Sequence, residues 1–94
     1  MLEMAHLSAR VCGRVQGVFF RYFVSDLAEK AGLVGFVRNL PSGDVVEVQA
    51  EGDKQELEKL VERLKKGPPG ASVDGVEISW SEFSGQFSSF GIRY

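Results

Sequence analysis

The hydrophobic pattern of the chain switches twice from the period of a strand to the period of a helix, and this order limits the folds that it can adopt. Residues 5–15 alternate between apolar and polar side chains, as a strand with one buried face does. Apolar residues then recur at helical spacing from Phe20 to Ala31, and Gly32 follows where a helix commonly ends. The chain therefore begins with a strand and an amphipathic helix.

The rest of the chain repeats this order with one additional strand. Asp53 occupies the N-cap position of a second helix, which basic residues, glycines and prolines end after Lys66. A turn is predicted over residues 41–44, and a loop rich in serine and glycine over 81–89. The predicted strands cover residues 5–15, 33–40, 46–51, 76–80 and 90–94.

The order β-α-β-β-α-β with a short terminal strand predicts an α+β fold of the ferredoxin-like, split β-α-β type. In this sandwich an antiparallel or mixed sheet carries both helices on one face. The chain has 94 residues, of which 44% are hydrophobic and 26% charged, so residues 1–94 are expected to form a single domain. Glu47, Gln49 and Glu51 alternate with apolar residues and are expected on the face of the third strand that is not buried.

Composition excludes several classes of function. A net charge of −2 favours neither nucleic acid nor an anionic membrane as a partner. The protein is expected to be a monomer. The N-terminus lacks the pattern of an export signal, which predicts a cytoplasmic location. One cysteine, Cys12, and one histidine, His6, do not make a recognisable metal site, and no cofactor is expected. His6 is expected to be solvated near the chain terminus.

The start of the first helix breaks two local rules. Residues 16–20 contain no Ser, Thr, Asp or Asn to accept hydrogen bonds from the free N–H groups of the first turn. Arg21 adds a cation at the positive end of the helix dipole. The free N–H groups and the cation at the positive end of the dipole both cost free energy, and a bound anion would reverse both costs. Free N–H groups of a glycine-containing turn and a planar guanidinium bind phosphate oxygens well. We therefore expect a phosphate-binding loop formed by Val15, Gln16, Gly17, Val18, Phe19, Phe20 and Arg21.

Other anion-binding loops do not fit this stretch. No Gly-Lys-Ser/Thr follows, as a nucleotide-binding P-loop requires, and the spacing Gly-x-Gly-x-x-Gly is absent. The cysteine phosphatase loop places five residues between its Cys and Arg, whereas Cys12 and Arg21 are further apart. The aromatic residues Phe19, Phe20 and Phe23 are expected to pack in the core or against the loop.

Residues 13–21 resemble the first signature of the acylphosphatase family, Gly-x-Val-Gln-Gly-Val-x-Phe-Arg, at every fixed position. The second signature is present in residues 35–39 with Gly43 beyond it. The resemblance covers the whole β-α-β-β-α-β plan and implies that Arg21 and Asn39 are the catalytic residues. The chain departs from the family by one additional residue after Gly43, which we place in the turn or in a bulge beside it.

The resemblance implies hydrolysis of small-molecule acyl phosphates to a carboxylate and inorganic phosphate, with phosphate as a competitive inhibitor. Arg21 and the loop amides would hold the phosphoryl group, and Asn39 would orient the attacking water. Without the resemblance, Asn39 before Leu40-Pro41 fits an asparagine that caps a turn. The alternative function is a non-enzymatic, phosphate-binding regulatory module related to the acylphosphatase-like domain of carbamoyl-transfer proteins. Some ferredoxin-like sheets bind RNA, but this sequence lacks the aromatic signature and the basic surface that RNA binding requires.

Overall fold

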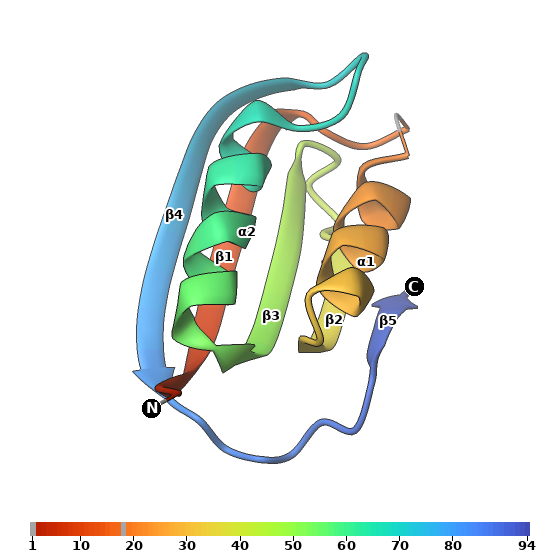
Figure 1. Cartoon of the computed structure of the whole chain (residues 1–94). Helices are drawn as coiled ribbons and strands as arrows, with labels where there is room; N and C mark the ends of the chain where they lie inside the picture. Colours follow the sequence, from red (N-terminus) through yellow and green to blue (C-terminus); the bar gives the residue numbers. More distant parts are fainter. Residues whose placement is uncertain (1, 18) are drawn as a thin grey trace.

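The computed structural model describes residues 2–17 and 19–94, and its two helices lie on one face of a 5-stranded sheet (Figure 1). This arrangement confirms the predicted α+β, ferredoxin-like sandwich. The elements follow the chain as β1 (Met4–Arg14), α1 (Phe20–Lys30), β2 (Val34–Asn39), β3 (Val45–Asp53), α2 (Lys54–Lys66), β4 (Ser72–Glu82) and β5 (Phe90–Arg93).

In the strand order β4-β1-β3-β2-β5, the C-terminal ends of β1 and β2 lie at the same end of the sheet, on either side of β3. β3 pairs antiparallel with both β1 and β2, so these two strands run in the same direction. Cys12 is opposite Val45 and Asn39 is opposite the next residue, Val46. The loop after β1 and the turn after β2 therefore meet at one end of the molecule, at the top of Figure 1. β5 runs parallel to β2, which makes the sheet mixed.

The core forms between the sheet and the two helices, from the side chains that the periodicity predicts. Inward-facing residues of β1 and β3, such as Leu7 and Val48, are fully buried. Each helix turns one stripe of apolar residues toward them, as an amphipathic helix does. The stripes consist of Phe20, Val24 and Ala28 in α1 and of Leu57, Leu60, Val61 and Leu64 in α2.

The edge strand β4 is longer than predicted. Its backbone pairs with β1 from Arg14↔Ser72 to Ala5↔Glu82, with one register shift. Most of its side chains are exposed, so the strand needs no apolar alternation and its polar ends carry no sequence signal. The loop before β5 is correspondingly shorter than predicted and begins at Phe83.

The face of the sheet opposite the helices is partly covered, and this overturns two expectations. Glu51 is fully buried, although its position in the alternation predicts exposure. The loop between β4 and β5 covers it: the Ser84 hydroxyl donates to Glu51 Oε2 at 2.7 Å and the Gly85 amide donates to Oε1 at 3.1 Å. His6 is not solvated either, because its Nδ1 lies 2.6 Å from Glu51 Oε2 and its Nε2 lies 2.7 Å from Gln49 Oε1.

This network sets the ionisation of Glu51. Burial by itself raises the pKa of the carboxyl, but hydrogen bonds from the Ser84 side chain, from His6 and from the Ser84 and Gly85 amides outweigh it and lower the pKa to about 2. The ionised carboxylate therefore fastens the loop before β5 to the centre of the sheet.

In the part of the chain that the structure describes, no helix has the length and apolarity of a membrane span.

Candidate active site

The loop between β1 and α1 is shaped by a bulge at the end of β1. The pairing of β1 with β4 shifts between Cys12 and Gly13, where Gly13 has φ 131°. A Cβ at this residue would lie 2.2 Å from the carbonyl oxygen of Ser72, so only glycine allows β4 to approach so closely. The Gly13 N–H turns toward the β2–β3 turn and donates to the Asp44 carbonyl at 3.0 Å.

The first helix begins without a cap, as the sequence predicts. The N-cap residue is Phe19, which makes no side-chain cap hydrogen bond and has left-handed backbone angles, φ 61° and ψ 25°. No acidic residue stands in the first turn. Among the described residues, the amides of Gln16, Gly17, Phe19 and Phe20 have no hydrogen-bond acceptor. These N–H groups and the positive end of the helix dipole are thus available to an anion.

Arg21 and Asn39 line one cavity of about 160 Å³, although they lie in different elements. Val15, Gly17, Phe19, Phe20 and Tyr22 complete its lining. The structure therefore brings together the two residues that the acylphosphatase resemblance singles out. Val18 of the predicted loop lies outside the described residues.

Asn39 is the last residue of β2, and its side chain does not cap the turn that follows. Its Oδ1 atom is buried and has no hydrogen-bond partner among the described residues. The turn is closed by backbone bonds instead, from the Leu40 amide to the Val45 carbonyl at 2.9 Å and from the Gly43 amide to the Leu40 carbonyl at 3.2 Å. A buried, unpartnered polar atom costs free energy and is typical of a functional site.

The additional residue after Gly43 is absorbed by the turn. The pairing of β2 with β3 runs without a register shift from Val34↔Glu51 to Asn39↔Val46. The bulge that the structure does contain lies between β1 and β4. Asn39 therefore pairs with Val46 in a regular register despite the additional residue.

Gln16 has a role that the sequence did not reveal. Its side-chain Nε2 donates to the backbone carbonyls of Leu40 at 2.9 Å and of Val45 at 3.0 Å. The phosphate loop is thereby tied to both sides of the turn that follows Asn39. Val15 lines the cavity, but its amide donates to the Gly13 carbonyl at 3.0 Å and is already engaged within the loop.

Arg21 has aromatic rather than acidic neighbours. Its guanidinium carbon lies 4.7 Å from the ring centroid of Tyr94, and among the described residues it forms no ion pair with a carboxylate. The pKa of the Tyr94 phenol lies above its usual 10.0, first because of a hydrogen bond with Tyr22, while the Arg21 charge opposes this rise. Phe20 is buried and Phe23 partly buried as expected, but Phe19 is 76% exposed and belongs to neither the core nor the loop packing.

Known proteins share the sequence pattern and the fold of this chain. The family model for acylphosphatase matches residues 7–92. An acylphosphatase of Dehalococcoides mccartyi is 49% identical over 88 residues, which cover 94% of this chain and 97% of that protein. The crystal structure of acylphosphatase from Bacillus subtilis superposes with a TM-score of 0.91 at 39% identity and covers 96% of this chain and 99% of that one.

A larger protein also contains this fold. The crystal structure of T. kodakarensis HypF matches with a TM-score of 0.81 at 32% identity, but the match covers 96% of this chain and only 12% of HypF. The matches to the D. mccartyi and B. subtilis proteins, in contrast, extend over nearly their whole length. From the family model and these full-length relatives, the chain belongs to the acylphosphatase family.

Proposed function

We propose that the protein hydrolyses the carboxyl-phosphate bond of small-molecule acyl phosphates to a carboxylate and inorganic phosphate. The observation that carries this proposal is the single cavity at which Arg21, Asn39 and the uncapped start of α1 meet. Membership of the acylphosphatase family supports the same reaction. The alternative of a non-enzymatic anion-binding module is not favoured.

Arg21 and the loop are proposed to bind the phosphoryl group. The guanidinium offers two parallel N–H donors to two phosphate oxygens, and the free amides of Gln16, Gly17, Phe19 and Phe20 offer further donors. The positive end of the α1 dipole adds to this field. Because these donors are held in place before substrate binds, they stabilise the charge on the equatorial oxygens in the transition state without reorganisation.

Asn39 is proposed to orient the attacking water. Its amide is not used by the turn, and its buried Oδ1 lacks a partner among the described residues. A water held by this amide in line with the leaving carboxylate would attack phosphorus directly. An acyl phosphate is already activated, so the phosphate itself can accept the proton that the water loses. The mechanism then needs water as its second reactant and neither a metal ion nor a cofactor.

We further propose that residues 1–94 act as one acylphosphatase-like domain and as a monomer in the cytoplasm. No nucleic acid or membrane takes part in this proposal, which agrees with a net charge of −2. Inorganic phosphate, the product, should compete with substrate because it fits the same donors.

Turnover of benzoyl phosphate by the purified chain tests the proposal, with release of inorganic phosphate followed over time. The parent protein should release phosphate, and Arg21→Gln should lose at least about 10²-fold in kcat while remaining folded. Phosphate release at the rate of buffer alone would overturn the proposed function.

A further inference from the structure

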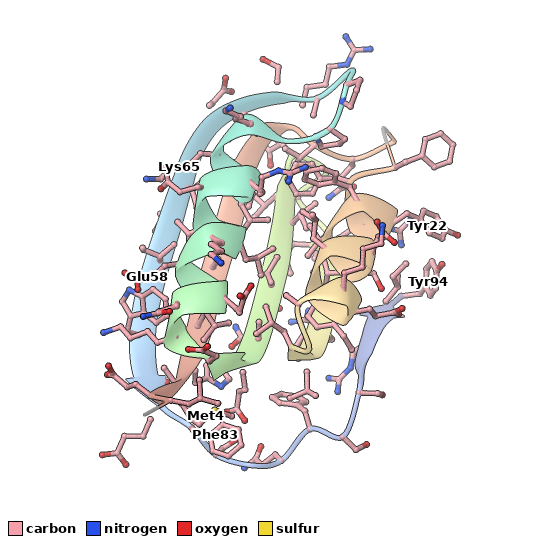
Figure 2. All side chains as sticks on the ribbon, viewed as in Figure 1. Met4, Tyr22, Glu58, Lys65, Phe83 and Tyr94 are labelled. Carbon is pink, nitrogen blue, oxygen red and sulfur yellow. The ribbon has the colours of Figure 1, made fainter. Side chains whose placement is uncertain are left out.

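Three exposed aromatic residues surround the mouth of the phosphate cavity. Phe19 and Tyr22 line the cavity itself, and Tyr94 lies over Arg21. Phe19 is 76%, Tyr22 55% and Tyr94 89% exposed, which is unusual for side chains of this size. Figure 2 shows Tyr22 and Tyr94 next to each other beside α1, whereas Met4 and Phe83 lie away from them at the bottom of the view.

The three rings form one connected group, which we call the aromatic rim. The ring centroids of Phe19 and Tyr22 are 6.1 Å apart at an interplanar angle of 51°. The side chains of Tyr22 and Tyr94 lie next to each other, and Tyr22 is the main cause of the raised pKa of the Tyr94 phenol. The Tyr94 ring centroid lies 4.7 Å from the guanidinium carbon of Arg21. The rim is therefore continuous with the group that is proposed to bind phosphate.

The rim is not a by-product of core packing. The buried stripe of α1 consists of Phe20, Val24 and Ala28, and Tyr22 does not belong to it. Phe19 has φ 61°, a left-handed conformation that is unfavourable for a bulky residue. An unfavourable backbone that holds a large apolar ring in solvent beside a binding cavity is expected where the ring contacts a ligand.

The size of the cavity says which part of the substrate meets the rim. At about 160 Å³ it is smaller than the roughly 300–1,000 Å³ of pockets that enclose a whole organic ligand. If the phosphoryl group binds at Arg21, the acyl group bonded to it must leave through the mouth of the cavity. Phe19, Tyr22 and Tyr94 are the side chains that it then meets.

We propose that the aromatic rim recognises the acyl group and favours acyl phosphates with an aromatic acyl group over acetyl phosphate. This inference rests on the proposed function and adds its substrate class. A flat acyl ring offers faces and edges for offset or edge-to-face contact with Phe19 and Tyr22, whereas an acetyl group offers them only a methyl group. The rim acts on substrate binding and leaves the chemistry to Arg21, the loop and Asn39.

The test compares kcat/KM for benzoyl phosphate and acetyl phosphate in the parent and in four variants. The ratio of the two values should fall by about three- to tenfold in Tyr22→Ala and also fall in Tyr94→Ala, mainly through a higher KM for benzoyl phosphate. Tyr22→Phe keeps the ring and should keep the ratio. Phe83→Ala removes an exposed ring far from the cavity and should also keep it. Dividing the ratio of each variant by the ratio of the parent cancels the difference in intrinsic reactivity of the two substrates.

The possible results distinguish a failure of the aromatic rim proposal from a failure of the proposed hydrolysis. A ratio that stays at the parent value in both folded Tyr22→Ala and Tyr94→Ala overturns the rim while the proposed function stands. A ratio that falls equally in Phe83→Ala overturns it as well, because the effect would then not belong to the cavity mouth. If the parent hydrolyses neither substrate, the proposed function fails and the rim fails with it.

Discussion

Gln16 reaches from the phosphate loop across to β2 and donates its side-chain amide to the backbone carbonyl of Leu40, the residue after Asn39, at 2.9 Å. A second bond from the same nitrogen reaches the Val45 carbonyl at 3.0 Å. One amide group therefore helps to fix the position of Asn39 relative to the loop. The Gln16 side chain forms no hydrogen bond with the side chain of Arg21 or Asn39, so its role is to position the loop and the turn.

Replacing Gln16 by methionine keeps the length of the side chain and removes both hydrogen bonds. Each of the two carbonyls keeps a backbone donor, the Gly43 amide for Leu40 and the Leu40 amide for Val45, but loses its second hydrogen bond. The loss of the two bonds should lower the free energy of unfolding by about 1–3 kcal/mol in total. Because the loop and the turn lose two of the hydrogen bonds between them, kcat should fall by about tenfold or more, even at a temperature where the variant is fully folded. Benzoyl phosphate kinetics and urea unfolding check both effects.

The matched control is Gln55→Met, since Gln55 is an exposed residue of α2 far from the cavity. Its kcat should equal that of the parent. If Gln16→Met loses stability but keeps the parent kcat, the side chain only holds the fold together and does not position the site.

Arg21→Lys should be almost as inactive as Arg21→Gln. The lysine ammonium is a point charge and cannot make two parallel hydrogen bonds to a phosphoryl group, and loss of a transition-state clamp commonly costs ~10²–10⁵ in rate. Arg14→Lys, a change at an exposed arginine that does not line the cavity, should stay within about twofold of the parent. Near-normal turnover by Arg21→Lys would contradict the bidentate role.

Asn39→Ala separates chemistry from binding. If the amide orients water while Arg21 and the loop hold phosphate, kcat should fall strongly while the dissociation constant of inorganic phosphate stays nearly unchanged. Asn39→Asp should be at least as inactive, because it loses the N–H donors and adds negative charge beside the phosphoryl group. The phosphate dissociation constant follows from the rise in Tm with phosphate concentration.

A purely structural Asn39 would give the opposite pattern. Asn39→Ala would then lower stability and weaken phosphate binding while kcat stays close to that of the parent. Measured together on this variant, the three quantities decide between the two roles.

Glu51 should make the protein sensitive to acid. Its pKa is about 2 in the folded protein, below the 4.5 of an unperturbed glutamate, so the ionised network stabilises the fold above about pH 4.5. This contribution should be lost progressively as the pH falls toward 2. At neutral pH, Glu51→Gln should lower the free energy of unfolding by about 1.5–3 kcal/mol, the value of hydrogen bonds to a charged group.

Urea unfolding at pH 7 and pH 3 checks this prediction. The loss of stability between the two pH values should be smaller in Glu51→Gln than in the parent. Glu58→Gln, at an exposed residue of α2, should keep the acid dependence of the parent. An unchanged acid dependence in Glu51→Gln would assign the effect to other carboxyls.

The fold was predictable because periodicity and caps agree along the chain. Strand alternation at Leu7, Ala9 and Val11, the helical stripes and the Asp53 cap, whose side chain accepts from the Gln55 amide at 3.1 Å, all specify one arrangement. The missing cap before Arg21 was equally informative, because free N–H groups beside a guanidinium favour an anion site. Strand bounds were less accurate where a partner strand, rather than side-chain pattern, decides pairing, as in β4.

Features that depend on contacts between distant segments could not be predicted. The burial of Glu51 and His6 depends on a loop more than thirty residues away, and the alternation of β3 carries no trace of it. The Gln16 bonds join side chain to backbone, and any residue can offer a carbonyl. The exposure of Phe19 follows from a left-handed backbone that no residue type in the loop announces.

The most direct test of the account is hydrolysis of benzoyl phosphate by the parent protein in water enriched in ¹⁸O. Direct in-line attack of water on phosphorus, in the cavity that Arg21 and Asn39 share, predicts one labelled oxygen in inorganic phosphate and none in benzoate, and both Arg21→Gln and Asn39→Ala should release labelled phosphate much more slowly. Label in benzoate, or labelled phosphate released by both variants at the parent rate, would contradict it.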